Sequence, residues 1–274
     1  MQPFHLTQAA PHGQMHAAPQ NAVLQVRNLT KVYGNARTGV QATALKGLNL
    51  TVERGDFVSI MGPSGSGKST LLNLLAGLDT ASSGEIWVQG QNMASMRQND
   101  LALFRRRNLG FVFQDFNLLD TLTLGENIAL PLSLDGKKNQ EIRPAVLKVM
   151  SFLGINEYLN RYPYEVSGGQ QQRAAVARAV VHNPSLLLAD EPTGNLDSAS
   201  SRALLELFQR LNQTIGTTIL MVTHDPLSAS YSRRVVSIKD GQVHSELQRS
   251  ADQQAFFQQI LNLLAQLEGS HGVA

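Results

Sequence analysis

The chain has 274 residues, which is long enough to bury a substantial core as one large domain or two small ones. Its 42% of hydrophobic residues exclude wholesale disorder, and its net charge of +2 is nearly balanced. A dedicated nucleic-acid binder would carry a basic excess, so no nucleic-acid partner is expected. The sequence contains no cysteine, which excludes a disulfide framework and a thiolate metal site. No stretch approaches about 18 consecutive apolar residues, so a membrane-spanning partner would have to be a separate polypeptide.

Residues 1–22 are expected to form a disordered tail. They contain no Lys or Arg and no apolar segment of the kind that a secretory signal requires. Three histidines occur there (His5, His12 and His16), but the surrounding Gln, Ala and Pro residues favour a disordered tail over a metal site. The lack of a signal and of cysteine together predict a cytoplasmic protein.

From residue 23 onward, short β-rich runs alternate with helical stretches. Strands are predicted at residues 23–29, 47–52, 56–61, 86–89, 111–113, 186–189, 217–222, 234–238 and 242–244, and helices at 68–77, 171–181, 201–213 and 252–267. This alternation predicts an α/β core domain over residues 23–250 with a mostly parallel sheet. The mainly helical residues 99–183 are interpreted as an inserted subdomain, and 251–274 as a C-terminal amphipathic helix and tail.

One loop has the composition of a phosphate-binding site. Residues 62–69 match G-x-x-x-x-G-K-[ST] completely, between a predicted strand and a predicted helix. The glycines let backbone N–H groups turn inward, and the helix N-terminus adds partial positive charge. Lys68 would reach the β- and γ-phosphates, and the Ser69 hydroxyl would hold Mg²⁺. The predicted nucleotide site comprises Gly62, Pro63, Ser64, Gly65, Ser66, Gly67, Lys68, Ser69 and Thr70.

A second motif ends a buried strand with two acids. Four apolar residues, 186–189, lead directly into Asp190 and Glu191. Asp190 suits the Mg²⁺ shell, and Glu191 is placed to accept a proton from an attacking water. Two surface acids at a strand end are the alternative, and the phosphate loop elsewhere in the chain favours the catalytic interpretation.

A third motif precedes the acidic pair and indicates a protein family. Ser167, Gly168, Gly169 and Gln170 open a predicted helix before Asp190. With the other two motifs, this segment resembles the signature of ATP-binding-cassette ATPases over residues 23–244. The resemblance implies ATP hydrolysis with ATP and Mg²⁺. It also implies a P-loop nucleotide-binding domain with a mixed, mainly parallel sheet, an inserted helical subdomain and an N-terminal antiparallel β portion.

The resemblance assigns four more residues. Tyr33 resembles the aromatic residue that stacks on adenine, although it could simply pack on the sheet. Gln114 looks like the lid glutamine that contacts Mg²⁺ and water. Asp197 resembles the residue of the loop that crosses the dimer interface, and His224 the switch histidine that contacts the γ-phosphate. The arginine run 105–107 is interpreted as a solvated helix face.

The signature also predicts a dimer on physical grounds. Ser167 can cap the following helix, and the two glycines leave its N–H groups open as a second anion site. Because this site and the phosphate loop belong to different subdomains, one chain can hardly wrap one nucleotide with both. A two-fold homodimer solves this, with each phosphate loop facing the partner's signature.

The finer resemblance is to ATPases of bacitracin-type antimicrobial-peptide transporters, within the lipoprotein-release and macrolide-export branch. It is carried by residues 114–123, 126–128, 221–226, 228–231, 238–241 and 256–260. It implies a separate membrane permease, a cell-envelope peptide antibiotic as the molecule handled and, in some cases, a sensor histidine kinase as a further partner. The chain would then be peripheral on the inner face of the membrane.

Other classes of cassette remain as alternatives. Lipoprotein-release, macrolide-export and cell-division complexes share every ATPase motif, so only the lid and C-terminal likenesses argue against them. Chromosome-maintenance ATPases place a long coiled coil between the two nucleotide motifs, and no sustained heptads separate Lys68 from Asp190. Translation-factor types carry two cassettes on one chain, whereas this chain has one.

Overall fold

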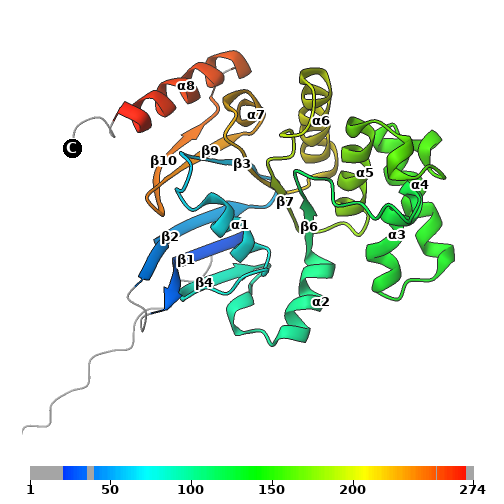
Figure 1. The fold of residues 1–274 in the computed structure, drawn as a ribbon, viewed down its shortest axis with the longest axis horizontal. Helices are drawn as coiled ribbons and strands as arrows, with labels where there is room; N and C mark the ends of the chain where they lie inside the picture. The colour runs from blue at the N-terminus through cyan, green and yellow to red at the C-terminus, as the bar shows by residue number, and fades with distance from the viewer. Residues whose placement is uncertain (1–20, 36–39, 251, 270–274) are drawn as a thin grey trace, which may run out of the picture.

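A computed structural model describes residues 21–35, 40–250 and 252–269. These residues form a four-stranded sheet of order β2-β1-β4-β5 and a six-stranded sheet of order β10-β9-β3-β8-β7-β6. Figure 1 shows the smaller sheet at the lower left, the larger one in the centre and a group of helices at the right. The predicted α/β class is confirmed. The predictions for residues 1–20 and 270–274 lie outside the described residues.

The smaller sheet is the expected N-terminal antiparallel portion. β1 pairs in antiparallel fashion with both β2 and β4, and β5 extends β4. The strands are β1 (Ala22–Asn35), β2 (Val40–Glu53), β4 (Ser83–Val88) and β5 (Gln91–Asn92). The first two are longer than predicted, because their mutual ladder continues through register shifts beyond the apolar runs.

The larger sheet carries parallel strands whose carboxyl ends lie at one edge. β9, β3, β8, β7 and β6 pair in parallel, and β10 closes the sheet in antiparallel fashion. Strands covered on both faces read as continuous apolar runs, as β8 does, and β3 is apolar except for Ser59. The bounds are β3 (Phe57–Met61), β6 (Leu109–Val112), β7 (Leu186–Asp190), β8 (Ile219–Val222), β9 (Arg234–Lys239) and β10 (Gln242–Gln248).

Two hydrophobic cores cover the two faces of the larger sheet. Along β7, Leu186 and Leu188 join the core shared with the antiparallel sheet and α1 (Lys68–Leu75), whereas Leu187 and Ala189 join the core under the helices. This alternation follows from the two-residue period of a strand. The larger sheet is therefore the middle layer of the fold, with one core on each of its faces.

The helical region is built from α3 (Leu124–Leu134), α4 (Asn139–Leu153) and α5 (Gly168–Val180), which share the second core. The predicted interval 99–183 also contains β6 and most of α2 (Gln98–Asn108). β6 pairs with β7, and Phe104 of α2 belongs to the first core, so both elements also belong to the sheet layer and the interval is not wholly a separate helical unit.

The remaining helices differ from the sequence expectations at their ends. α6 covers Ser198–Arg210, three residues earlier than predicted at its start, because Asp197 caps it, and a π-turn at Leu211–Ile215 follows. α7 covers Pro226–Ser230. α8 covers Gln253–Gly269 and buries Phe256 and Ile260 against β3, α7 and β9. None of the described helices has the length and apolarity that crossing a membrane requires.

Gly110 lets α5 approach the sheet closely. A Cβ placed at this residue of β6 would lie 2.2 Å from the carbonyl oxygen of Ala179 in α5. A side chain there would therefore push backbone against backbone.

Gly110→Ala is expected to lower the free energy of unfolding by about 1–3 kcal/mol, because α5 must shift to admit the methyl group. The matched control is Gly168→Ala, where the nearest atom to a new Cβ lies 3.6 Å away, which is an ordinary contact. The control should change the free energy by less than about 0.5 kcal/mol. Urea denaturation measures both variants, and equal midpoints for the two would contradict the close-approach explanation.

Candidate functional site

The loop between β3 and α1 adopts a backbone conformation that requires glycine at two positions. Gly62 has φ of 150° and Gly67 has φ of 100°. A Cβ at Gly62 would lie 2.0 Å from the carbonyl oxygen of Ile238, and one at Gly67 would lie 2.5 Å from that of Ala44. The loop therefore fits closely against its neighbours, and a side chain at either glycine would displace it.

A cavity of about 400 Å³ opens beside this loop. Its walls combine the phosphate loop with residues from two other strand ends, which the sequence placed far apart. They are Ala44, Gly62, Ser64, Gly65, Gly67, Lys68, Ser69, Thr70, Glu191 and His224. Most of the predicted nucleotide site thus surrounds one space, although Pro63 and Ser66 do not line it.

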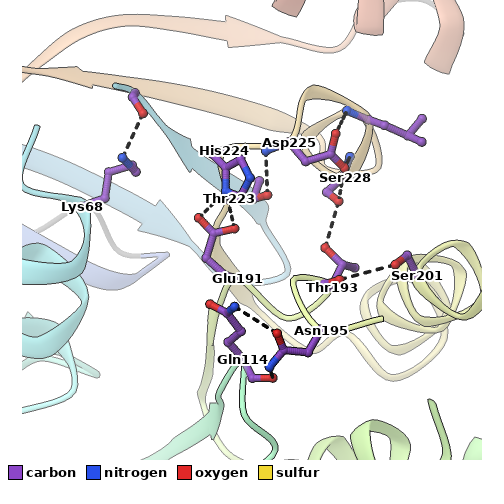
Figure 2. A network of polar contacts seen from close by, with 12 residues as sticks. Lys68, Gln114, Glu191, Thr193, Asn195, Ser201, Thr223, His224, Asp225 and Ser228 are labelled. Carbon is purple, nitrogen blue, oxygen red and sulfur yellow. Dashed lines mark hydrogen bonds and ion pairs between the residues drawn. The ribbon is translucent and has the colours of Figure 1, made fainter. Parts of the chain in front are cut away.

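The Lys68 side chain folds back over the loop. Its ammonium donates to the carbonyl oxygens of Gly62 at 2.9 Å and Pro63 at 2.8 Å. Figure 2 shows Lys68 with one of these bonds. Burial lowers the pKa of Lys68, while the negative charges of Glu191 and Asp190 oppose that shift. The site thus holds a half-buried cation whose charge is supported by two carboxylates, a setting in which a phosphate would add a further stabilising partner.

The two carboxylates stand where β7 ends. Burial raises the pKa of Asp190, the charge of Glu191 raises it further, and Lys68 opposes the shift. Glu191 has φ of 45°, and its N–H donates to the carbonyl of Val222 at the end of β8. This left-handed turn takes the chain off the sheet directly after the acidic pair.

Of the two acids, Asp190 is the one suited to bind Mg²⁺, whereas Glu191 is the expected base. Among the described residues, no three His, Cys, Asp or Glu side chains converge on a point that could hold a metal ion. Mg²⁺ is usually held by one or two carboxylates together with substrate phosphates. Burial, and after it the charge of Glu191, raises the pKa of Asp190, and a bound cation would favour the ionised form again. The donors present therefore suit Mg²⁺ that arrives with a nucleotide.

His224 and Glu191 are in direct contact, as Figure 2 shows. Nδ1 of His224 lies 2.9 Å from Oε1 and 2.8 Å from Oε2 of Glu191. Because an ionised carboxylate only accepts hydrogen bonds, Nδ1 carries the proton. The histidine side chain is 75% exposed whereas that of Glu191 is 20% exposed, so the imidazole stands at the cavity mouth and the carboxylate in its wall.

Gln114 lies outside the set of residues that line the cavity. Its Nε2 donates to Oδ1 of Asn195 at 3.3 Å, and Nδ2 of Asn195 donates to Oδ1 of Asp115 at 2.7 Å. The predicted lid glutamine is therefore tied to the segment that follows Glu191. Asn195 lies two residues before Asp197, but no pattern in the sequence indicated that it bonds Gln114.

The signature segment begins α5 with reciprocal caps. The Ser167 hydroxyl accepts from the Gln170 N–H at 3.4 Å, and Gln170 Oε1 accepts from the Ser167 N–H at 2.8 Å. The predicted cap is confirmed. None of the residues lining the Lys68 cavity comes from α5, so within one chain the two predicted anion sites stay separate.

Gln172, which no motif in the sequence indicated, is fully buried in α5. Its Nε2 donates to the carbonyls of Phe113 at 3.3 Å and Pro192 at 2.6 Å. It thereby joins the signature helix to the segments of Gln114 and Glu191. A third glutamine in the run 170–172 was the only signal in the sequence, and its burial could not be read from that run.

Tyr33 and Asp197 are both held by local contacts. The Tyr33 hydroxyl donates to Asp79 at 2.9 Å and the Lys31 ammonium lies 4.7 Å from its ring centre, while the ring is 41% exposed and does not line the cavity. Asp197 accepts from the N–H groups of Ala199 and Ser200, and hydrogen bonding from Ser200 lowers the pKa of Asp197.

The arginine run 105–107 lies at the surface, as expected, but each of its side chains also has a specific partner. Arg105 donates to the carbonyl of Gly77 at 2.8 Å, Arg106 to that of Leu134 at 2.5 Å, and Arg107 pairs with Asp135 at 2.7 Å. These partners lie at the carboxyl-terminal ends of α1 and α3, where helix dipoles attract cations. The run therefore fastens α2 to two other helices.

Comparisons with known proteins agree with this geometry. A family model described as ABC transporter matches residues 45–194. The ABC transporter ATP-binding protein YxdL of Bacillus subtilis is 50% identical over 248 residues, which cover 90% of this chain and 95% of that protein. The bacitracin export ATP-binding protein BceA of Halalkalibacterium halodurans is 47% identical over 249 residues, which cover 90% and 98%.

A solved structure gives the same result. The dimeric ATP-binding cassette MJ0796, in a post-hydrolysis state bound to ADP and Pi, superposes with a TM-score of 0.75 at 39% identity, covering 84% of this chain and 100% of that one. In this chain, the segments that follow β3, β7 and β8 bring Lys68, Glu191 and His224 to one cavity. This chain therefore belongs to the ABC transporter family and is an ATP-binding, ATP-hydrolysing subunit of such a transporter.

Proposed function

We propose that this chain powers a separate membrane permease that handles peptide antibiotics directed at the cell envelope. The observation that carries the ATPase part is the single cavity in which Lys68, Glu191 and His224 meet while the Ser167 segment stays outside it. The likeness to the bacitracin export protein BceA supports the peptide-antibiotic part. The chain would sit at the inner face of the membrane through its permease. A sensor histidine kinase is a further proposed partner, which rests on the family resemblance alone.

The residues divide the chemistry among them. The loop N–H groups and Lys68 bind the β- and γ-phosphates, and Ser69, Asp190 and Gln114 would hold Mg²⁺, which neutralises phosphate charge when bound. Glu191 accepts the proton of the attacking water. His224 holds the Glu191 carboxylate through Nδ1, and the γ-phosphate is the partner we propose for its exposed ring. Tyr33 is proposed to stack on adenine, outside the phosphate cavity.

The working unit is proposed to be a two-fold dimer with two shared sites. Ser167, Gly168 and Gly169 present a capped helix N-terminus that does not line the Lys68 cavity of the same chain. Asp197 lies at the start of α6, on the loop that follows Glu191. A second copy turned by a two-fold axis would bring its Ser167 helix to this cavity.

An apolar groove offers a surface for the permease. It has a volume of about 560 Å³, and its walls include Phe111 and Phe113 at the end of β6 and Pro131 of α3. Leu78 and Leu134 on its rim are 55% and 63% exposed, which is unusual for large apolar side chains that lie together. Because Phe113 directly precedes Gln114, a partner seated in this groove would act on the Gln114 loop.

The first test addresses the proposed base. Glu191→Gln keeps the shape of the side chain and removes the proton acceptor, so ATP hydrolysis should fall roughly 10²- to 10⁴-fold while ATP stays bound. Phosphate release and nucleotide retained after gel filtration measure the two effects. The control is Glu206→Gln on the exposed side of α6, which should hydrolyse ATP normally. Normal turnover in Glu191→Gln would remove Glu191 from the role.

The second test addresses the shared site. All chains carry Glu191→Gln, and differently tagged Lys68→Ala and Ser167→Arg chains are mixed. In the mixed dimer one site carries both lesions and the other carries neither, so about one ATP should be trapped per dimer. The arginine is chosen because its bulk blocks the helix N-terminus from a phosphate. The dimer arrangement fails if Ser167→Arg chains alone trap as much ATP as chains without that change.

The third test addresses the transported class. Disrupting this chain should lower the minimal inhibitory concentration of peptides that bind cell-wall lipid intermediates. Leu134→Glu should reproduce that sensitivity without loss of ATP hydrolysis by the purified chain, because the groove lies apart from the Lys68 cavity. Ile215→Glu, at another exposed apolar residue, is the control. Unchanged sensitivity combined with a lipoprotein-sorting or division defect would favour the alternative cassettes.

A further inference from the structure

The turn after Glu191 links two loops of the site. The Glu191 carbonyl accepts from the Gly194 N–H at 2.9 Å, so Thr193 lies inside a tight turn that starts at Glu191. Figure 2 shows this turn between the loop of His224 and the loop of Gln114. The side chains of Thr193 and Asn195 extend toward those two loops from one short piece of backbone.

Thr193 contacts the helix that follows His224. Its Oγ1 lies 3.2 Å from Oγ of Ser228, which is fully buried in α7. The Ser228 hydroxyl also lies 2.6 Å from Oδ2 of Asp225, the residue next to His224. Because the carboxylate can only accept hydrogen bonds, the Ser228 hydroxyl donates its hydrogen bond to Asp225. The hydroxyl of Thr193 must therefore be the donor in its contact with Ser228.

Asp225 connects Ser228 to the loop that carries His224. Its carboxylate caps α7 by accepting from the N–H groups of Leu227 at 3.1 Å and Ser228 at 2.9 Å. Its own N–H donates to Thr223 Oγ1 at 3.1 Å. The residues on both sides of His224 are therefore fixed, and Thr193 joins this rigid unit to the turn that begins at Glu191.

Asn195 reaches the other loop from the same turn. It exchanges hydrogen bonds with Gln114 through the side-chain amide and the main-chain carbonyl, both at 3.3 Å. A Cβ at Gly194 would lie 2.9 Å from the Gln114 side chain, so glycine leaves room for this approach. The Gln114 loop is thus held to the turn by a contact that does not involve Thr193, and the two contacts can be tested separately.

We propose that Thr193 is a positioning residue for ATP hydrolysis. By donating to Ser228, it holds the His224 loop at the distance from which His224 bonds Glu191. This inference rests on the roles proposed above for Glu191 and His224. It assigns no chemical step to Thr193, which contacts neither the cavity nor its proposed ligands.

The test is a double-mutant cycle on the purified full-length chain. Thr193→Val keeps the shape and removes the donor, so kcat should fall about fivefold to tenfold with KM within about twofold. Ser228→Ala should cost a similar factor, and the double variant should be no slower than the slower single variant. Thr193→Ser should restore kcat. In the Glu191→Gln background, Thr193→Val should leave the amount of trapped ATP unchanged.

Two comparisons separate this inference from its alternatives. Ser201→Ala is the control, because that hydroxyl bonds the carbonyl of Thr193 and not the His224 loop, and kcat should stay normal. The inference is overturned if Thr193→Val keeps kcat, if Thr193→Ser does not restore it, or if the two single effects multiply. Loss of activity in His224→Ala beside a normal Thr193→Val overturns this inference alone. Full activity in His224→Ala overturns the proposed role of His224 as well.

Discussion

The parallel pairing of β3, β7 and β8 is the constraint on which the site depends. Their registers place Asp190 opposite Val222 and Ile60 opposite Val222, so three chain segments leave the sheet at one edge. The strands are covered by core on both faces, which leaves that edge as the place where polar side chains meet. Lys68, Glu191 and His224 share a cavity because their segments follow these strand ends.

Charge balance then determines what the cavity can accept. Burial lowers the pKa of Lys68 and raises that of Asp190, so each group is less favoured in its charged form by its surroundings and supported by the charge of the other. A phosphate beside the lysine and a cation beside the acids would both gain from this arrangement. The site is therefore suited to a phosphate and a metal ion bound together more than to either one alone.

The loops around the cavity are coupled by side-chain amides and hydroxyls. Gln172 ties α5 to the segments before Gln114 and after Glu191, and Asn195 ties Gln114 to the same turn. A movement of the signature helix would thus reach both loops without passing through the sheet. This arrangement agrees with a cassette in which a second chain and a permease change the rate of ATP hydrolysis. Both partners are proposed to act near the loops of Gln114 and Glu191.

The sequence by itself determined the local chemistry. The phosphate loop, the acidic pair after an apolar strand and the Ser167 cap each depend on neighbouring residues, so each could be predicted from its motif. The roles of Tyr33, Gln114 and His224 came from the family resemblance. Features that depend on distant segments could not be predicted from local motifs. They are the contact of Thr193 with Ser228, the burial of Gln172, the partners of the 105–107 run and the close approach of α5 to Gly110. Only tertiary structure decided these, because strand order and register bring such residues together and a local pattern carries no record of its distant neighbours.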